Sequence, residues 1–77
     1  MIRYFIAYRE KDGRDFHGEP YIAPHEAGFS DKESALLEES LLKNSSYLDV
    51  IAFECNIDNK PEEFSWKYVK RHKIEQE

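Results

Sequence analysis

The chain has little cysteine, glycine or proline: one, three and three residues among 77. A single thiol, Cys55, cannot form an intrachain disulfide, so we expect a reducing, cytoplasmic setting. The glycines are too scattered for a phosphate-binding loop. No apolar run approaches the roughly 18 residues of a membrane span. The first residues alternate like a strand instead of forming a basic-then-apolar signal sequence, so we expect no targeting segment.

Basic residues are also in deficit, with 11 Lys and Arg compared with 16 Asp and Glu, a formal net charge of −5. This balance disfavours long-range attraction to nucleic acid or anionic lipid and favours steering toward a basic partner. Aromatic residues are plentiful at 14%, which argues against intrinsic disorder. The length predicts a single domain, residues 1–77, whose small core depends on large side chains.

Two segments show the period-2 alternation of β-strands. Residues 2–9 have apolar side chains on both faces, which predicts a strand covered on both sides. Residues 47–57 predict a second strand, and we expect its more apolar face to pack on a helix. That face comprises Tyr47, Asp49, Ile51, Phe53, Cys55 and Ile57. Because Cys55 lies on it, we predict a buried, unreactive thiol.

Residues 10–28 predict a long loop, a kind of segment that is often functional or mobile. Asp12-Gly13 is a hairpin-turn signal. Gly18, Pro20 and Pro24 weaken strand pairing, so the returning arm forms at most a short edge strand.

Residues 30–44 predict the main helix. Ser30 to Glu33 fits a capping box with Ser30 as the N-cap. On a helical wheel, Leu36 falls outside the apolar arc, which makes it a candidate contact for a partner. The expected arc contains Ala35, Leu37, Leu41 and Leu42.

The C-terminal segment 61–73 leaves two alternatives open. Asn59 and Pro61, followed by acidic residues, predict a helix start. Phe64, Trp66 and Tyr68 alternate as in a strand, which would pair with residues 50–57 through a hairpin. We favour the helix. The predicted fold class is therefore α+β: a small two-layer domain with an antiparallel-leaning sheet and one main helix packed on one face.

Catalytic and metal chemistry have weak support in the sequence. Five potential ligands gather in the loop, but their spacing matches no metal motif. They are Asp15, His17, Glu19, His25 and Glu26. No nucleophile has an identifiable base and orienting group. We therefore expect no enzyme, no metal and no cofactor.

The favoured function is a small acidic protein-binding module. We expect an inhibitor or modulator that occupies a basic surface of a larger protein. A surface with which the larger protein binds nucleic acid would be basic in this way. Phage-type antagonists of host defence are proteins of this general kind. The candidate contacts are Asp12, Asp15, Glu19, Glu26, Asp31, Glu33, Leu36, Glu38 and Glu39.

The alternative is a small nucleic-acid-binding regulator. Residues 66–73 interleave aromatic and basic side chains without an acid, a pattern that can stack on bases and contact phosphates. The candidates are Trp66, Lys67, Tyr68, Lys70, Arg71 and Lys73. Because the rest of the chain is acidic, we expect a protein partner in preference to nucleic acid, and no membrane partner.

Overall fold

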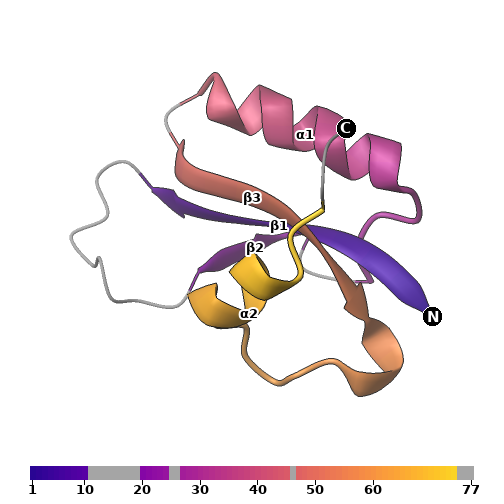
Figure 1. Cartoon of the computed structure of the whole chain (residues 1–77). Helices are drawn as coiled ribbons and strands as arrows, with labels where there is room; N and C mark the ends of the chain where they lie inside the picture. Colours follow the sequence, from indigo (N-terminus) through magenta and orange to yellow (C-terminus); the bar gives the residue numbers. More distant parts are fainter. Residues whose placement is uncertain (11–19, 25–26, 46, 75–77) are drawn as a thin grey trace.

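The structure is a computed structural model that describes residues 1–10, 20–24, 27–45 and 47–74. Its elements follow in the order β1 (Ile2–Glu10), β2 (Tyr21–Ala23), α1 (Lys32–Lys43), β3 (Tyr47–Asn56), a 3-10 turn η1 (Ile57–Asn59) and α2 (Trp66–Arg71) (Figure 1). The α+β class, the two long strands and the short edge strand are confirmed. The predicted Asp12-Gly13 turn lies outside the described residues.

The three strands form one antiparallel sheet in the order β2-β1-β3. The central strand β1 pairs Ile6 with Ala23 on one side and with Ala52 on the other. Beyond β2, Tyr4 and Phe29 exchange two backbone hydrogen bonds of 3.0 and 2.7 Å. This bridge ties the approach to α1 onto the sheet.

The two faces of the sheet are covered by different helices. Ile6, Val50 and Ala52 pack beneath α1, as the first apolar cluster, together with Ala35 of the helix. Phe5, Phe53 and Cys55 lie on the opposite face, in a second cluster with Phe64 and Val69. The main helix does pack on one face, as predicted, but the expectation that the Phe53 and Cys55 face meets it is wrong. Alternation predicts which residues share a face, not which helix covers it.

A β-bulge at Asp49 changes the faces of β3. The register with β1 shifts between Ala7 and Arg9, and Asp49 has a φ of 52°, in the left-handed region. One extra residue in a strand reverses the alternation beyond it. Tyr47 therefore packs beneath α1, with its ring 4.6 Å from that of Tyr8, and not on the Ile51 face where strict alternation placed it.

Helix α1 buries a different stripe from the predicted arc. Ala35 and Glu39 are buried, and Leu36 and Leu42 pack against the same cluster. Leu37 and Leu41 are instead 65% and 57% exposed. The prediction that Leu37 and Leu41 are buried is wrong because the buried stripe of the helix includes a carboxylate: Glu39 is only 3% exposed. Its Oε2 accepts a hydrogen bond from the backbone N–H of Ala52 in β3.

The N-cap of α1 is Asp31, not Ser30 as predicted. The Asp31 carboxylate accepts hydrogen bonds from the backbone N–H of Ser34 at 2.9 Å and from its hydroxyl. The Ser34 backbone N–H, and then its hydroxyl, lower the pKa of Asp31 below the ordinary value of 3.8. A lowered pKa in the folded state means that the ionised cap stabilises the fold.

We expect Asp31→Ala to lower the melting temperature at neutral pH, because it removes the acceptor for an otherwise unbonded N–H of the first turn. The stabilisation is present above the ordinary pKa of 3.8 and is lost as the pH falls through the lowered value. Thermal melts from neutral to strongly acidic pH should therefore converge for wild type and variant. Ser30→Ala is the matched control, and an equal loss in it would contradict the assignment of the cap.

The C-terminal segment is a short helix followed by an extended residue. Helix α2 starts at Trp66, later than predicted, and its N-cap is Ser65, whose hydroxyl accepts from the backbone N–H of Tyr68 at 3.1 Å. Lys73 then forms an antiparallel bridge with Phe53. The flanking bonds run from Glu54 N–H to the His72 carbonyl and from Ile74 N–H to the Ala52 carbonyl. The helix interpretation is confirmed for residues 66–71.

Cys55 is buried, as predicted, with 1% of its surface exposed. The hydroxyl of Tyr68 donates to its Sγ at 3.5 Å. We expect the native thiol to react with a thiol reagent far more slowly than the unfolded chain does. Cys55→Ser should cost about 1–3 kcal/mol, because it buries a more polar hydroxyl. Labelling of native protein at the unfolded rate would contradict this prediction.

Candidate functional site

The acidic candidates divide into three groups. Asp12, Asp15, Glu19 and Glu26 lie outside the described residues, as do the potential metal ligands of the 10–28 loop. Asp31, Leu36 and Glu39 have structural roles in capping and packing. Glu33 is exposed and Glu38 is partly exposed. Within the ranges that the structure describes, no group of three His, Cys, Asp or Glu side chains is placed to hold a metal ion.

The α1 outer face, defined here by Glu33, Leu37, Glu38 and Leu41, carries apolar and acidic side chains together. Leu37 and Leu41 are four positions apart, so they form one ridge on the solvent side of the helix. Glu33 lies one turn before Leu37, on the same side. The sequence pattern found these leucines but assigned them to the core.

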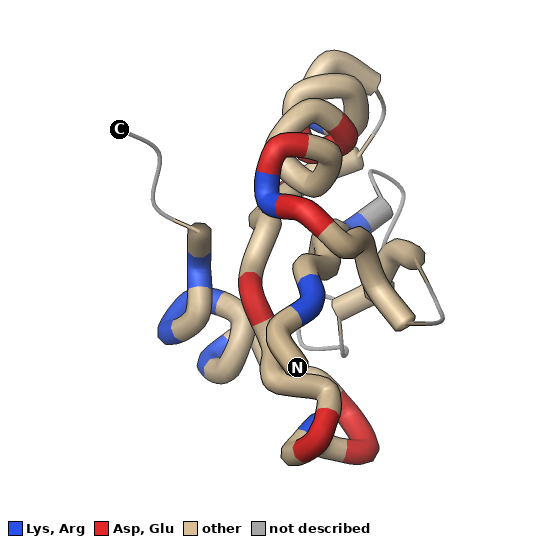
Figure 2. The backbone as a smooth tube through the Cα atoms, turned by 90° about the vertical axis from the view of Figure 1, so that its right-hand side faces the viewer, with Lys and Arg blue, Asp and Glu red and all other residues tan. Residues whose placement is uncertain are grey.

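Acidic and basic residues are concentrated on different parts of the fold. Figure 2 shows acidic residues along α1 and in the turn after β3, whereas the charged residues of α2 and of the short stretch after it are all basic. The side chains of Lys67, Lys70, Arg71 and Lys73 are all exposed. The acidic chain therefore has a local basic surface, and we call these residues the α2 basic surface.

The aromatic members of the nucleic-acid candidates are partly used in packing. Tyr68 stacks on His72 with ring centroids 4.1 Å apart and packs against Phe53 and Phe64. Burial, and then the hydrogen bond to Cys55, raise the pKa of Tyr68 to about 12. Tyr68 is therefore partly used in packing. Trp66 also packs against the second cluster, and it lines a pocket together with Lys70.

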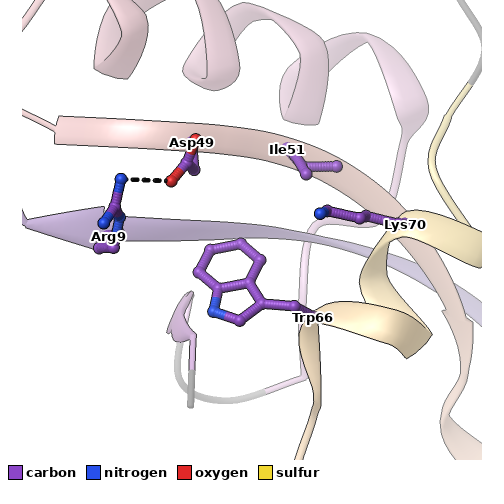
Figure 3. Close-up of a pocket in the computed structure, with 5 residues that line it drawn as sticks. All are labelled: Arg9, Asp49, Ile51, Trp66 and Lys70. Atoms are coloured by element: carbon purple, nitrogen blue, oxygen red, sulfur yellow. Dashed lines mark ion pairs between the residues drawn. The ribbon is translucent and has the colours of Figure 1, made fainter. Parts of the chain in front are cut away.

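A pocket of about 370 Å³ lies between the sheet and α2. It is lined by Arg9 of β1, Asp49 and Ile51 of β3, and Trp66 and Lys70 of α2 (Figure 3). Arg9 Nη2 and Asp49 Oδ2 form an ion pair of 2.8 Å. Sequence reasoning included Trp66 and Lys70 but missed the other three. The sequence contained one signal for this site: Trp66 and Lys70 are four positions apart, so a helix places them on the same side.

A second pocket, of about 360 Å³, opens where β2 meets the segment after η1. Its lining mixes opposite charges, and the ammonium of Lys60 lies 5.3 Å from the ring centroid of Phe5 and 5.7 Å from that of Phe64. The lining comprises Pro20, Tyr21, Ile22, Lys60, Glu62, Glu63 and Phe64. Lys60 is thereby engaged with the aromatic core and is a poorer ligand group than Lys70.

Comparison of the chain with protein-family models, with curated proteins and with solved structures finds no match. None of the helices in the described part of the chain is long and apolar enough to cross a membrane.

Proposed function

We propose that the chain is a small acidic protein-binding module that inhibits or modulates a larger protein by occupying a basic surface on it. It carries out no catalysis of its own and acts in the cytoplasm, a setting that suits its one unpaired thiol. The contact surface is the α1 outer face. The acidic residues of the 10–28 loop, Asp12, Asp15, Glu19 and Glu26, extend the negative charge of the same module.

The observation that carries the proposal is the exposure of Leu37 and Leu41, at 65% and 57%. Helix α1 packs on the sheet through Ala35, Leu36 and Leu42, and these two leucines are not among the residues packed against that cluster. An amphipathic helix docks into an apolar groove through anchors spaced at i, i+3, i+4 and i+7, and Leu37 and Leu41 have the i and i+4 spacing.

The charge around this ridge indicates the chemistry of the partner. Glu33 and Glu38 flank the leucines, and the whole chain has a net charge of −5. A partner with an apolar groove and a basic rim satisfies both features. Opposite charges at the rim accelerate association, while the apolar centre sets the lifetime of the complex.

The test begins with capture of the partner on immobilised protein, its identification by mass spectrometry, and rate measurements with the purified partner. We expect Leu37→Ala with Leu41→Ala mainly to accelerate dissociation, by removing apolar contact. Glu33→Lys with Glu38→Lys should mainly slow association, and the effect should fade as salt screens the charges beyond a Debye length of about 10 Å at 0.1 M.

Ile2→Ser is the matched control, since it removes an apolar side chain that is 46% exposed but lies on β1. It should leave both rates unchanged. A partner bound equally well by the leucine variant and by wild type would contradict the proposal, provided that both variants melt as the wild type does.

The second candidate is a nucleic-acid-binding regulator, favoured by the exposure of Lys67, Lys70, Arg71 and Lys73 together. It predicts salt-sensitive binding to single- or double-stranded nucleic acid in a gel shift. Replacing the four cations by Gln should abolish that binding and flatten its salt dependence, because each phosphate contact contributes about one unit of slope. The protein-binding proposal predicts that the same variant keeps its partner.

A further inference from the structure

The pocket between β1, β3 and α2 is separate from the α1 outer face. Arg9, Asp49 and Ile51 lie on the face of the sheet that α2 covers, whereas α1 packs on the other face. Its volume of about 370 Å³ falls in the range of small-molecule sites, roughly 300–1,000 Å³. Occupancy of this pocket can therefore be tested independently of the proposed protein partner.

The walls of the pocket suit a flat ring. The indole of Trp66 lines one side, and Ile51 supplies an apolar surface on the sheet (Figure 3). An indole face offers offset stacking to another aromatic ring, in addition to the burial of apolar area. Trp66 starts α2, whose N-cap Ser65 and buried Val69 fix the helix against the sheet.

The charges of the pocket favour an anion. The carboxylate of Asp49 is paired with the Arg9 guanidinium at 2.8 Å, so among the described residues that line the pocket the charge left over is that of the Lys70 ammonium. Figure 3 shows the Lys70 ammonium on the opposite side of the indole from the ion pair. A cationic ligand could stack on the indole, but Lys70 would repel it.

We propose that this pocket binds a small planar anion: an aromatic ring that stacks on Trp66 and carries a carboxylate or phosphate for Lys70. A lysine ammonium binds either group as a compact point charge through charge-assisted hydrogen bonds. The Asp49 side of the pocket can accept a hydrogen bond from an N–H or amino group on the ring.

Trp66 is the one tryptophan of the chain, so its fluorescence reports directly on this pocket. The probes are adenosine 5′-monophosphate and benzoate, with adenosine as the ring without an acid and ribose 5-phosphate as the acid without a ring. We expect saturable quenching by one or both of the complete probes. Lys70→Gln should weaken that binding about tenfold, the typical loss for one charge-assisted hydrogen bond.

Lys67→Gln is the matched control, because it removes an exposed cation from the same helix that does not line the pocket. It should leave the affinity unchanged. Quenching by the nucleotide alone would identify a phosphate ligand, and quenching by benzoate alone a carboxylate ligand. The proposal is overturned if neither probe binds at millimolar concentration, if adenosine binds as tightly as its monophosphate, or if the two lysine variants lose affinity equally.

Discussion

Replacing Gly28 by alanine is expected to destabilise the fold by about 3 kcal/mol. Gly28 has a φ of +80°, and a Cβ at this position would lie 2.9 Å from Cζ of Phe5 and 2.9 Å from the carbonyl oxygen of Tyr4. Both neighbours belong to the central strand, and Phe5 is fully buried, so neither can move freely. Backbone strain and overpacking therefore add together.

Arg3 holds the backbone of Ala27 and Gly28 in place, which makes the effect of Gly28→Ala more severe. Its Nε donates to the carbonyl of Ala27 at 2.8 Å, and its Nη2 donates to the carbonyl of Gly28 at 2.9 Å. A backbone shift that relieves the clash would disturb these two hydrogen bonds. Ala27→Ser is the control, since Ala27 is exposed and surface changes usually stay within about 0.5 kcal/mol. Urea denaturation measures the free energy of unfolding of both variants. If Gly28→Ala leaves that free energy nearly unchanged, residue 28 does not lie as close to Phe5 and Tyr4 as the structure places it.

Replacing the buried Glu39 by alanine is expected to cost about 3–4 kcal/mol. The change leaves the backbone N–H of Ala52 without its acceptor and opens a cavity beneath α1. Stability of a domain of this size is roughly 4–12 kcal/mol, so this loss is a large share of the total. The matched variant Glu39→Gln keeps an oxygen acceptor and should cost only about 1 kcal/mol.

Two further measurements separate the hydrogen bond from the ion pair that Glu39 makes with Lys43 at 3.1 Å. Lys43 is half exposed, so Lys43→Gln should cost less than about 1 kcal/mol. Hydrogen exchange of the Ala52 amide should accelerate in Glu39→Ala and stay protected in Glu39→Gln. If Glu39→Ala loses no more stability than Lys43→Gln, the hydrogen bond from the Ala52 N–H to the Glu39 carboxylate is not what joins α1 to β3.

The sequence predicted the features of the fold that depend on local periodicity. Alternation located both long strands, and the apolar residues on both faces of β1 correctly indicated that it is covered on both sides. The prolines correctly limited β2 to a short edge strand. These signals are local because a strand's side chains alternate whatever the rest of the chain does.

The errors arose where a distant backbone group decides the outcome. Glu39 is buried because the N–H of Ala52 faces it across the fold, and no pattern within the helix contains that information. The bulge at Asp49 reversed the face of Tyr47, and a strict alternation does not indicate where an extra residue interrupts the pairing. The pocket was missed because it joins Arg9 to Asp49, two charged residues that are unremarkable until the sheet brings them together.

The outer edge of β3 is already occupied over its central part. The Ala52 N–H donates to the Glu39 carboxylate. The Glu54 N–H donates to the His72 carbonyl, and the Ala52 carbonyl accepts from the Ile74 N–H. An exposed strand edge would be a template on which another chain adds a strand. Among the described residues, the other edge of the sheet is the three-residue strand β2. The sheet thus offers little backbone for β-augmentation, and it is shielded on the β3 side from edge-to-edge aggregation. Recognition through the described sheet accordingly depends on side chains and not on strand addition.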